Sequence, residues 1–221
     1  MKNDVVILFT RVPVPGKVKT RLQPFLTGEE CCALQRAFIL DVFGVLLKTG
    51  VEIVVSYAPD GDPAELKALL PEARAFFPQS GKALGAKMYK TIRQTLKSGY
   101  ERCLLVGSDI PLLRAEMIHE TFRLLDAHDI VLCPTEDGGY YLIGMNKPAE
   151  AVFHINEYGS STVFEKTLTA AASSGLSCAV GPGTMDIDKP EDLFKLTEKL
   201  KSLSPNTCPE TRKVLSKLNT E

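Results

Sequence analysis

The sequence lacks tryptophan, and its 221 residues include only three histidines and six cysteines. Six cysteines are too sparse for a disulfide-stapled scaffold, and none forms a C-x-x-C pair, so we expect a reducing, cytoplasmic setting. No signal-peptide pattern opens the chain, which agrees with that expectation. Apolar runs such as 5–9 and 103–106 are far shorter than the ~20 residues of a membrane-spanning helix. We therefore expect no membrane segment.

Neither sign of charge is in excess. Lysine and arginine number 26 against 27 acidic residues, a formal net charge of −1. A protein that coats nucleic acid needs a positive field to release counterions from phosphates, so this class is excluded. The 44% hydrophobic and 24% charged residues are typical of a globular protein. The balance still allows one small basic site for a small anion.

Short β-branched runs alternate with longer helical patterns along the chain. This alternation predicts a doubly wound, mostly parallel α/β sheet flanked by helices. A capping box at Thr27 and Glu30 opens the first long helix, and Pro190 opens the last one. We expect strands at 5–9, 51–57, 75–77, 102–106, 129–133, 139–145 and 176–180, and helices at 28–48, 63–70, 84–97, 114–127, 161–173 and 190–203.

Composition changes near the C-terminus. From Ser204 the chain turns polar and then has a weak helical pattern at 210–218. We therefore predict one domain over residues 1–203 and a polar tail, with a possible short helix, over 204–221. In open α/β sheets ligands bind beyond the carboxyl ends of the strands, so the loops there are the places to seek chemistry.

The loop after the first strand is strongly basic. Gly16 lets the backbone approach a ligand closely, and the flanking prolines stiffen the loop. Lysine and arginine here can bind a polyphosphate, and an arginine can do so with two parallel hydrogen bonds. A solvated basic turn is the alternative, but the position after the first strand favours phosphate binding. The basic residues of this loop are Arg11, Lys17, Lys19 and Arg21.

Several familiar motifs are absent. The first loop does not fit a Walker A loop, because Arg11 and Val18 stand where glycine and Ser or Thr are needed. No G-x-G-x-x-G dinucleotide fingerprint and no G-x-S-x-G nucleophile elbow occurs. The three histidines fall in helical patterns or at their ends, where packing or surface roles are expected.

Acidic residues follow later strands. Asp109, between a glycine and a proline, is placed for a hard divalent cation such as Mg²⁺ or Mn²⁺. Asp186 and Asp188 point the same way if their segment is extended, so either can be a second ligand. The alternatives are that Asp109 and Asp188 cap the helices that follow them.

A third acidic loop contains Asp137, Gly138 and Gly139. The glycine pair suits close approach of a ligand, and Asp137 can accept a hydrogen bond from an acceptor hydroxyl or act as general base. An Asp-Gly hairpin turn between two strands is the alternative. The two interpretations are compatible.

Together these segments resemble the bacterial GT-A-like glycosyltransferases, relatives of nucleotide-diphospho-sugar transferases. The resemblance spans about residues 5–193 and rests on PVPGKVKTRL at 13–22, GSDIP at 107–111, DGGYYLIG at 137–144 and DIDKPEDL at 186–193. It implies a GT-A fold that binds a nucleotide in its N-terminal half, with a divalent metal at the diphosphate. It also implies that Asp109 and Asp188 are metal-side residues.

A further segment of the resemblance, QSGKALGAKM at 79–88, implies that Gln79 and Gly81 contact the base and Lys87 a phosphate. The chain departs from the family pattern at Ala83, where an acidic residue is usual, and at Tyr158, where relatives commonly have tryptophan. We therefore expect the polar contacts near residue 83 and the stacking of the acceptor to differ from those of the family.

The leading hypothesis is metal-assisted glycosyl transfer from a nucleotide sugar to a small-molecule acceptor. Asp137, Lys19 and Arg21 would act at the reacting groups, because the basic loop neutralises charge on the leaving group. The resemblance also reaches guanylyltransferases, in which a nucleoside triphosphate is attacked and pyrophosphate leaves; this is the alternative. A non-catalytic nucleotide-binding regulator is the third hypothesis. The nucleotide base, the acceptor and the oligomeric state are left open.

Overall fold

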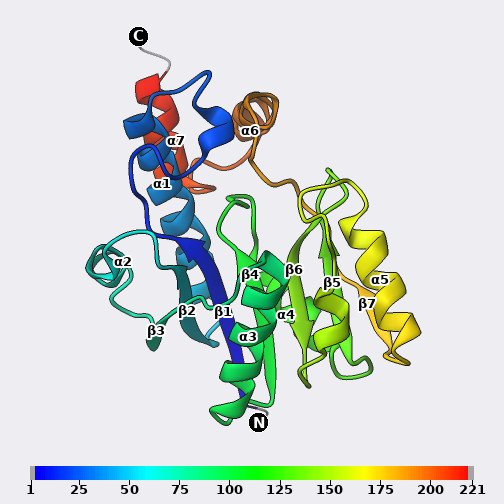
Figure 1. The fold of residues 1–221 in the computed structure, drawn as a ribbon. Helices are drawn as coiled ribbons and strands as arrows, with labels where there is room; N and C mark the ends of the chain where they lie inside the picture. Colours follow the sequence, from blue (N-terminus) through cyan, green and yellow to red (C-terminus); the bar gives the residue numbers. More distant parts are fainter. Residues whose placement is uncertain (1–2, 219–221) are drawn as a thin grey trace.

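A computed structural model describes residues 3–218. A seven-stranded sheet in the order β3-β2-β1-β4-β6-β5-β7 runs through the molecule (Figure 1). The elements in chain order are β1 (Asp4–Arg11), η1 (Thr20–Leu22), α1 (Gly28–Leu47), β2 (Glu52–Ala58), α2 (Pro63–Leu69), β3 (Ala75–Pro78), α3 (Leu84–Lys97), β4 (Arg102–Gly107), α4 (Ala115–Leu124), β5 (Ile130–Pro134), β6 (Tyr140–Met145), η2 (Glu150–Phe153), α5 (Val163–Ser173), β7 (Cys178–Val180), α6 (Pro190–Ser202) and α7 (Pro209–Leu218).

All strand pairs are parallel except those that β6 makes with β4 and β5. The mostly parallel sheet predicted from the sequence is therefore confirmed. The carboxyl ends of β1, β2 and β4 lie at one edge of the sheet, together with the turn between β5 and β6. This edge carries the loops that the sequence singles out.

Two hydrophobic layers cover the sheet because side chains alternate along each strand. On β1, Val6 and Leu8 face a layer made with α1, α2 and α4. Val5 and Ile7 face the opposite layer, made with α3, η2 and α5. Burial on both faces explains why the central strands read as continuous apolar runs.

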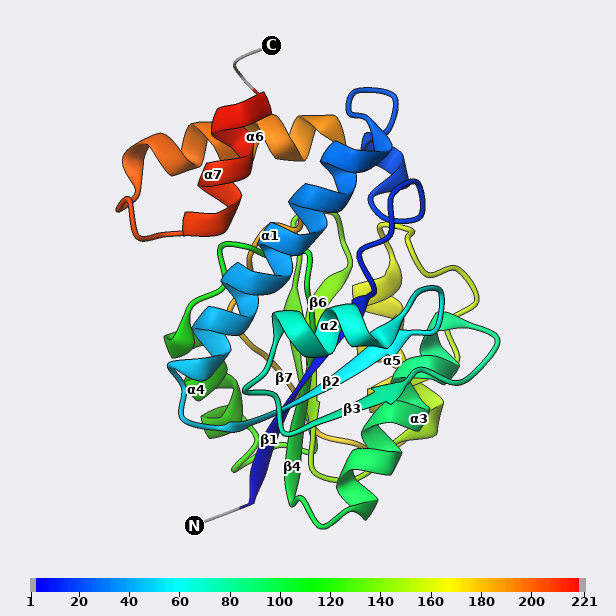
Figure 2. The ribbon, with the colours of Figure 1, turned by 90° about the vertical axis from the view of Figure 1, so that its left-hand side faces the viewer.

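A third cluster lies beyond the edge of the sheet. The first half of α1 packs there against α6 and α7, and Figures 1 and 2 both show these helices together at the top of the molecule. Asp41 of α1 accepts hydrogen bonds from Glu210 N, Thr211 N and Thr211 Oγ1 at 3.0, 2.8 and 2.6 Å, and so holds the start of α7.

The predicted elements all have counterparts, with ends that differ by a few residues. The capping box at Thr27 and Glu30 is present. The division into a domain over 1–203 and a tail over 204–221 stays a prediction. Residues 1–2 and 219–221 of those two parts lie outside the described residues. No helix within 3–218 is long and apolar enough to cross a bilayer.

Candidate active site

A cavity of about 550 Å³ lies at the carboxyl ends of the parallel strands. It brings together most of the residues that the sequence singles out, although they come from six separate loops and helices. Those that line it are Arg11, Lys19, Arg21, Gln79, Lys87, Asp109, Asp137, Gly139, Asp186 and Asp188. Four others, Gly16, Lys17, Gly81 and Gly138, do not line it.

Those four residues have identifiable places beside the cavity. Lys17 Nζ donates to the carbonyl of Asp60, which itself lines the cavity, at 3.2 Å. Gly16 and Gly81 have φ values of +77° and +133°, which side chains disfavour. Gly138 (φ +87°) lies so close to Ser161 that a Cβ atom would be 2.1 Å from the carbonyl oxygen of that residue. The glycines therefore shape the loops around the cavity.

The basic loop is paired with acidic groups on other segments. Arg11 forms an ion pair with Asp60 at 2.5 Å, and Arg21 forms one with Asp188 at 2.7 Å. Both arginine side chains are more than half exposed. Exposed ion pairs are weak, because each charge is well solvated, so these arginines are available to an anionic ligand.

Lys19 differs from its neighbours, because its side chain is only 2% exposed. Its ammonium lies 2.7 Å from Oδ1 of Asp109 and donates to the carbonyl of Ile187 at 2.6 Å. The sequence indicates a phosphate ligand here. In the structure Lys19 lines the cavity, but its ammonium is paired with the acidic loops.

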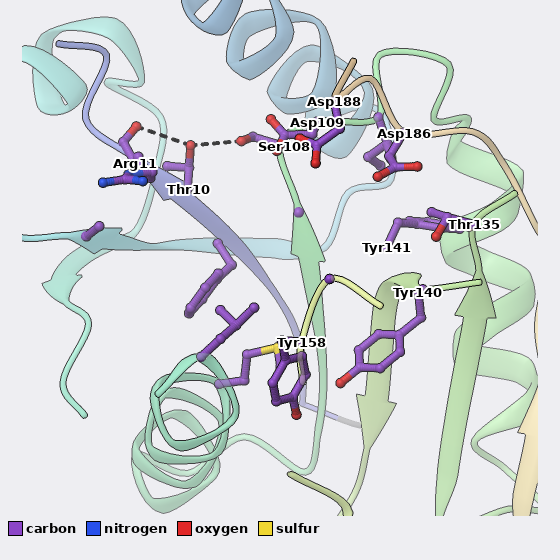
Figure 3. A pocket seen from close by; sticks show the side chains of 18 of the residues that line it. Thr10, Arg11, Ser108, Asp109, Thr135, Tyr140, Tyr141, Tyr158, Asp186 and Asp188 are labelled. Carbon is purple, nitrogen blue, oxygen red and sulfur yellow. Dashed lines mark hydrogen bonds between the residues drawn. The ribbon is translucent and has the colours of Figure 1, made fainter. Parts of the chain in front are cut away.

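Four carboxylates gather at the same end of the cavity: Figure 3 shows three of them, Asp109, Asp186 and Asp188, beside one another. Burial, followed by repulsion from Asp137, Asp188 and Asp109, raises the pKa of Asp186 to about 6. Met185 and Ile187 are buried in the core, so Asp186 and Asp188 both face outward, as an extended segment requires.

Neither helix-capping alternative holds. The helix after Asp109 begins only at Ala115, with Arg114 at the N-cap position. Lys189 is the N-cap of α6, and the side chain of Asp192 accepts from the backbone N–H groups of Asp188 and Lys189. Asp109 and Asp188 are thus free of capping roles and face the cavity.

Asp137 forms the turn between β5 and β6. Its Oδ1 accepts hydrogen bonds from Thr135 Oγ1 at 2.6 Å and Gly139 N at 2.9 Å. Thr135 N also donates to Gly139 O across the turn. The hairpin-turn interpretation is therefore confirmed, and the same turn brings Asp137 to the cavity.

Gln79 is almost fully buried, and both of its amide hydrogens are used by the protein. Its Nε2 donates to the carbonyls of Thr10 and Ser56 at 3.0 and 3.1 Å. A carbonyl can only accept, so the amide nitrogen must face the strands and Oε1 must point elsewhere. Any contact of the Gln79 side chain with a nucleotide base would therefore use Oε1.

Sequence reasoning missed a polar network under the cavity. Thr10 Oγ1 donates to Ser108 Oγ at 3.0 Å (Figure 3). Gln35 of α1 donates to the same oxygen at 3.0 Å. The network fixes the ends of β1 and β4 against α1. Asp60, which pairs with Arg11, was also missed; its place in a polar loop after a strand was the available signal.

Aromatic side chains line the far end of the cavity, away from the carboxylates. Figure 3 shows Tyr140 and Tyr158 there. Tyr158 donates to the carbonyl of Phe153 at 3.3 Å. Gly85 of α3 permits this packing, because a Cβ atom at residue 85 would lie 2.8 Å from the Tyr158 hydroxyl. Tyr158 is thus held in place as part of the cavity wall.

The acidic end suits a hard divalent cation. Within residues 3–218 no three acidic, histidine or cysteine side chains form a ready-made metal site. Mg²⁺ usually takes only one or two carboxylates and completes its shell with water and substrate phosphate. Oδ1 of Asp109 is buried, while the side chain as a whole is 43% exposed, so its other oxygen faces the cavity. The residues present therefore fit Mg²⁺ or Mn²⁺.

A family model described as "Uncharacterized protein conserved in bacteria (DUF2064)" matches residues 41–160. The chain belongs to this family. The crystal structure of a "putative nucleotide-diphospho-sugar transferase" from Desulfovibrio desulfuricans G20 is similar to this DUF2064 protein, with 30% identity, a TM-score of 0.88, and coverage of 99% of this chain and 98% of that chain.

Two curated relatives are guanylyltransferases. A 2-phospho-L-lactate guanylyltransferase from Methanocaldococcus infernus is 28% identical, over 85% of this chain and 83% of the relative. A 3-phospho-D-glycerate guanylyltransferase from Phenylobacterium zucineum is 28% identical, over 80% and 83%. A CMP:2-keto-3-deoxy-manno-octonic acid synthetase complexed with CTP shares the fold, with 11% identity and a TM-score of 0.58.

These relatives confirm the predicted class, an enzyme of the transferase type, and the predicted fold. The guanylyltransferases among them favour the nucleotidyltransferase alternative over the leading glycosyltransferase hypothesis. The resemblance drawn from sequence motifs therefore identified the superfamily correctly, and its emphasis on sugar transfer is less well supported.

Proposed function

We propose that this protein is a metal-dependent nucleotidyltransferase that transfers GMP from GTP to a small phosphorylated carboxylic acid and releases pyrophosphate. The observation that carries the proposal is the convergence, in one cavity, of an exposed basic loop and three outward-facing carboxylates. The similarity to guanylyltransferases supports the choice of guanine and of a phosphorylated acceptor.

The basic loop would hold the triphosphate. Arg11 and Arg21 lie at the two ends of this loop, and their exposed charges face the cavity and suit a triphosphate. As the bond between the α-phosphorus and the bridging oxygen breaks, negative charge grows on the departing pyrophosphate. Cationic side chains placed there stabilise that charge more in the transition state than in the ground state.

Asp109, Asp186 and Asp188 would hold Mg²⁺ or Mn²⁺. The cation, when bound, supplies Lewis-acid stabilisation and orients the phosphate groups. The protein contributes the fixed directions of the carboxylates: buried Met185 and Ile187 hold the Asp186–Asp188 segment extended, and Lys19 holds Asp109.

A phosphorylated acceptor changes the role expected of Asp137. A phosphate monoester is already largely ionised at pH 7, with a second pKa near 6, so its oxygen can attack the α-phosphorus without losing a proton. Asp137 would then orient the acceptor from the β5–β6 turn and would not act as a general base. A sugar acceptor hydroxyl, by contrast, would need a base.

The test supplies GTP with Mg²⁺ and, in separate reactions, 2-phospho-L-lactate or 3-phospho-D-glycerate, and measures pyrophosphate and the mass of the product. We expect pyrophosphate release that depends on an acceptor, and a product whose mass equals that of the acceptor plus GMP less one water. ATP, CTP and UTP in place of GTP test the base. Release of nucleoside diphosphate from a nucleotide sugar, without pyrophosphate from any triphosphate, would support glycosyl transfer instead.

A further inference from the structure

Lys19 has an unusual backbone as well as a buried side chain. Its φ and ψ are 49° and 39°, in the left-handed region that few residues other than glycine adopt. Among the non-glycine residues of 3–218, only Cys208 also has a positive φ. The conformation comes immediately before η1. The result is that the Lys19 side chain lies inside, while the side chains of Lys17 and Arg21 in the same loop remain at the surface.

The ammonium of Lys19 joins the two acidic loops. It lies 2.7 Å from Asp109 Oδ1 on the β4 loop and 2.6 Å from the carbonyl of Ile187, the residue between Asp186 and Asp188. The two loops are also tied by a backbone hydrogen bond of 2.9 Å from Ile187 N to Asp109 O. On its remaining side the ammonium lies 5.2 Å from the centre of the Phe38 ring, a favourable cation–π distance.

We propose that Lys19 is a positioning residue that assembles the metal site and does not bind the phosphates of the nucleotide. The inference rests on the proposed function in so far as that function includes the metal site. Lys19 fixes one oxygen of Asp109 so that the other faces the cavity. It also holds the backbone between Asp186 and Asp188, so that both loops present their carboxylates together before a cation arrives.

Charge and burial support this role over phosphate binding. Carboxylates at this end repel one another, and a buried positive charge between two of the loops offsets that repulsion at short range. A phosphate at Lys19 would have to compete with Asp109 and the Ile187 carbonyl, which the buried ammonium already contacts at 2.7 and 2.6 Å. The exposed Arg11 and Arg21, which also line the cavity, can meet the phosphates by giving up exposed ion pairs alone.

The experiment measures Mn²⁺ binding in the absence of any nucleotide, by calorimetry and by electron paramagnetic resonance. We expect Lys19→Met to weaken Mn²⁺ binding about tenfold or more, because groups that orient metal ligands typically contribute 10–100-fold to affinity. The matched control is Lys17→Met. Lys17 lies in the same loop, but its exposed ammonium donates to the carbonyl of Asp60 and contacts neither acidic loop, so the variant should bind Mn²⁺ as tightly as the wild type.

The sign of the effect decides between the roles. Unchanged or tighter Mn²⁺ binding by Lys19→Met would overturn the proposal, because a phosphate ligand, or a mere competitor for Asp109, would leave metal affinity equal or higher. If the wild type binds no Mn²⁺, the metal site and this inference both fail. If wild-type protein binds Mn²⁺ and releases pyrophosphate but Lys19→Met binds Mn²⁺ normally, only this inference fails.

A second variant guards against loss of folding. Lys19→Gln retains an N–H donor for the Ile187 carbonyl but lacks the charge, and we expect it also to weaken Mn²⁺ binding. Melting temperatures of Lys19→Gln, Asp109→Asn and the double variant form a cycle in the absence of metal. If Lys19 acts through Asp109, the Lys19 change should lower the melting temperature less when Asp109 is already asparagine. Strict additivity would contradict the proposal.

Discussion

At the scale of single residues, the cavity separates groups by exposure more than by type. Arg21 is exposed and Lys19 is buried, although they lie two positions apart and have the same sign of charge. Their residue types and spacing could be predicted from the sequence as a basic loop. The sequence could not predict that one is buried and the other exposed. This difference depends on contacts of Lys19 with residues 109 and 187, which only the folded sheet brings together.

Asp109→Asn tests the metal ligand. Asparagine keeps the size of the side chain but loses the charge, so it binds a divalent cation poorly. A metal ion stabilises the transition state by several kcal/mol, so we expect kcat/KM for GTP consumption to fall about 100-fold or more. Steady-state kinetics over a range of Mg²⁺ concentrations measure this. Wild-type activity in a folded Asp109→Asn protein would show that this carboxylate does not hold the metal.

Asp137→Asn tests how the acceptor is activated. Asparagine can still accept the hydrogen bonds of Thr135 Oγ1 and Gly139 N through its own Oδ1, so the turn is retained. If the acceptor is a phosphate monoester, we expect kcat to fall by less than about tenfold. Removal of a general base costs about 10²–10⁴-fold. A loss in that larger range, with an unchanged circular dichroism spectrum, would indicate a hydroxyl acceptor.

At the scale of elements, positions along the chain could be predicted more completely than pairing in the sheet. The helix at 84–97 and the capping box of α1 depend on local sequence, and both have their expected bounds. The order β1-β4-β6-β5 depends on long-range packing of apolar strands that resemble one another. The hairpin turn at Asp137 makes β6 antiparallel to β5. The sequence predicts this turn, but it does not predict that β6 also pairs with β4.

The docking of α7 depends on Asp41, which caps its N-terminus from α1. We expect Asp41→Ala to lower the free energy of unfolding by about 1–3 kcal/mol, because the buried N–H groups of Glu210 and Thr211 and the Thr211 hydroxyl lose their acceptor. Urea unfolding measures the change. Glu210→Gln, which leaves the backbone donors intact, is the control. An unchanged midpoint in Asp41→Ala would show that α7 docks by apolar contact alone.

The same residue gives a pH dependence. Burial raises the pKa of Asp41 above 3.8 by more than the hydrogen bonds from Thr211 and Glu210 lower it. The native state therefore favours the neutral carboxyl; the stability it contributes is complete below the ordinary pKa and is lost as the pH rises through the raised value. Relative to Asp41→Asn, which does not titrate, the wild type should lose stability as the pH rises above about 4 and through the raised pKa of Asp41. A difference that is constant with pH would contradict this assignment.

At the scale of the whole molecule, the net charge of −1 gives no sign of the charged groups at the cavity. There, basic residues of the first loop form ion pairs with acidic residues of other loops. The ion pairs are Arg11 with Asp60, Lys19 with Asp109, and Arg21 with Asp188. A triphosphate that takes Arg21 leaves Asp188 without its partner, and a cation that takes Asp188 releases Arg21. Each ligand therefore removes the electrostatic cost of binding the other, and linkage makes this effect reciprocal.

Thermal unfolding tests this coupling in the intact protein. At about 100 times its Kd, a ligand that binds only the native state adds about 2.7 kcal/mol of stability, or roughly 5–10 °C for a chain of this size. We expect GTP and Mg²⁺ together to raise the melting temperature by more than the sum of the shifts that each produces alone. In Arg21→Gln the excess should shrink, because Asp188 no longer has a partner to release. Additive shifts in the wild type would mean that the two halves of the site bind independently, and the paired charges would then be ordinary surface ion pairs.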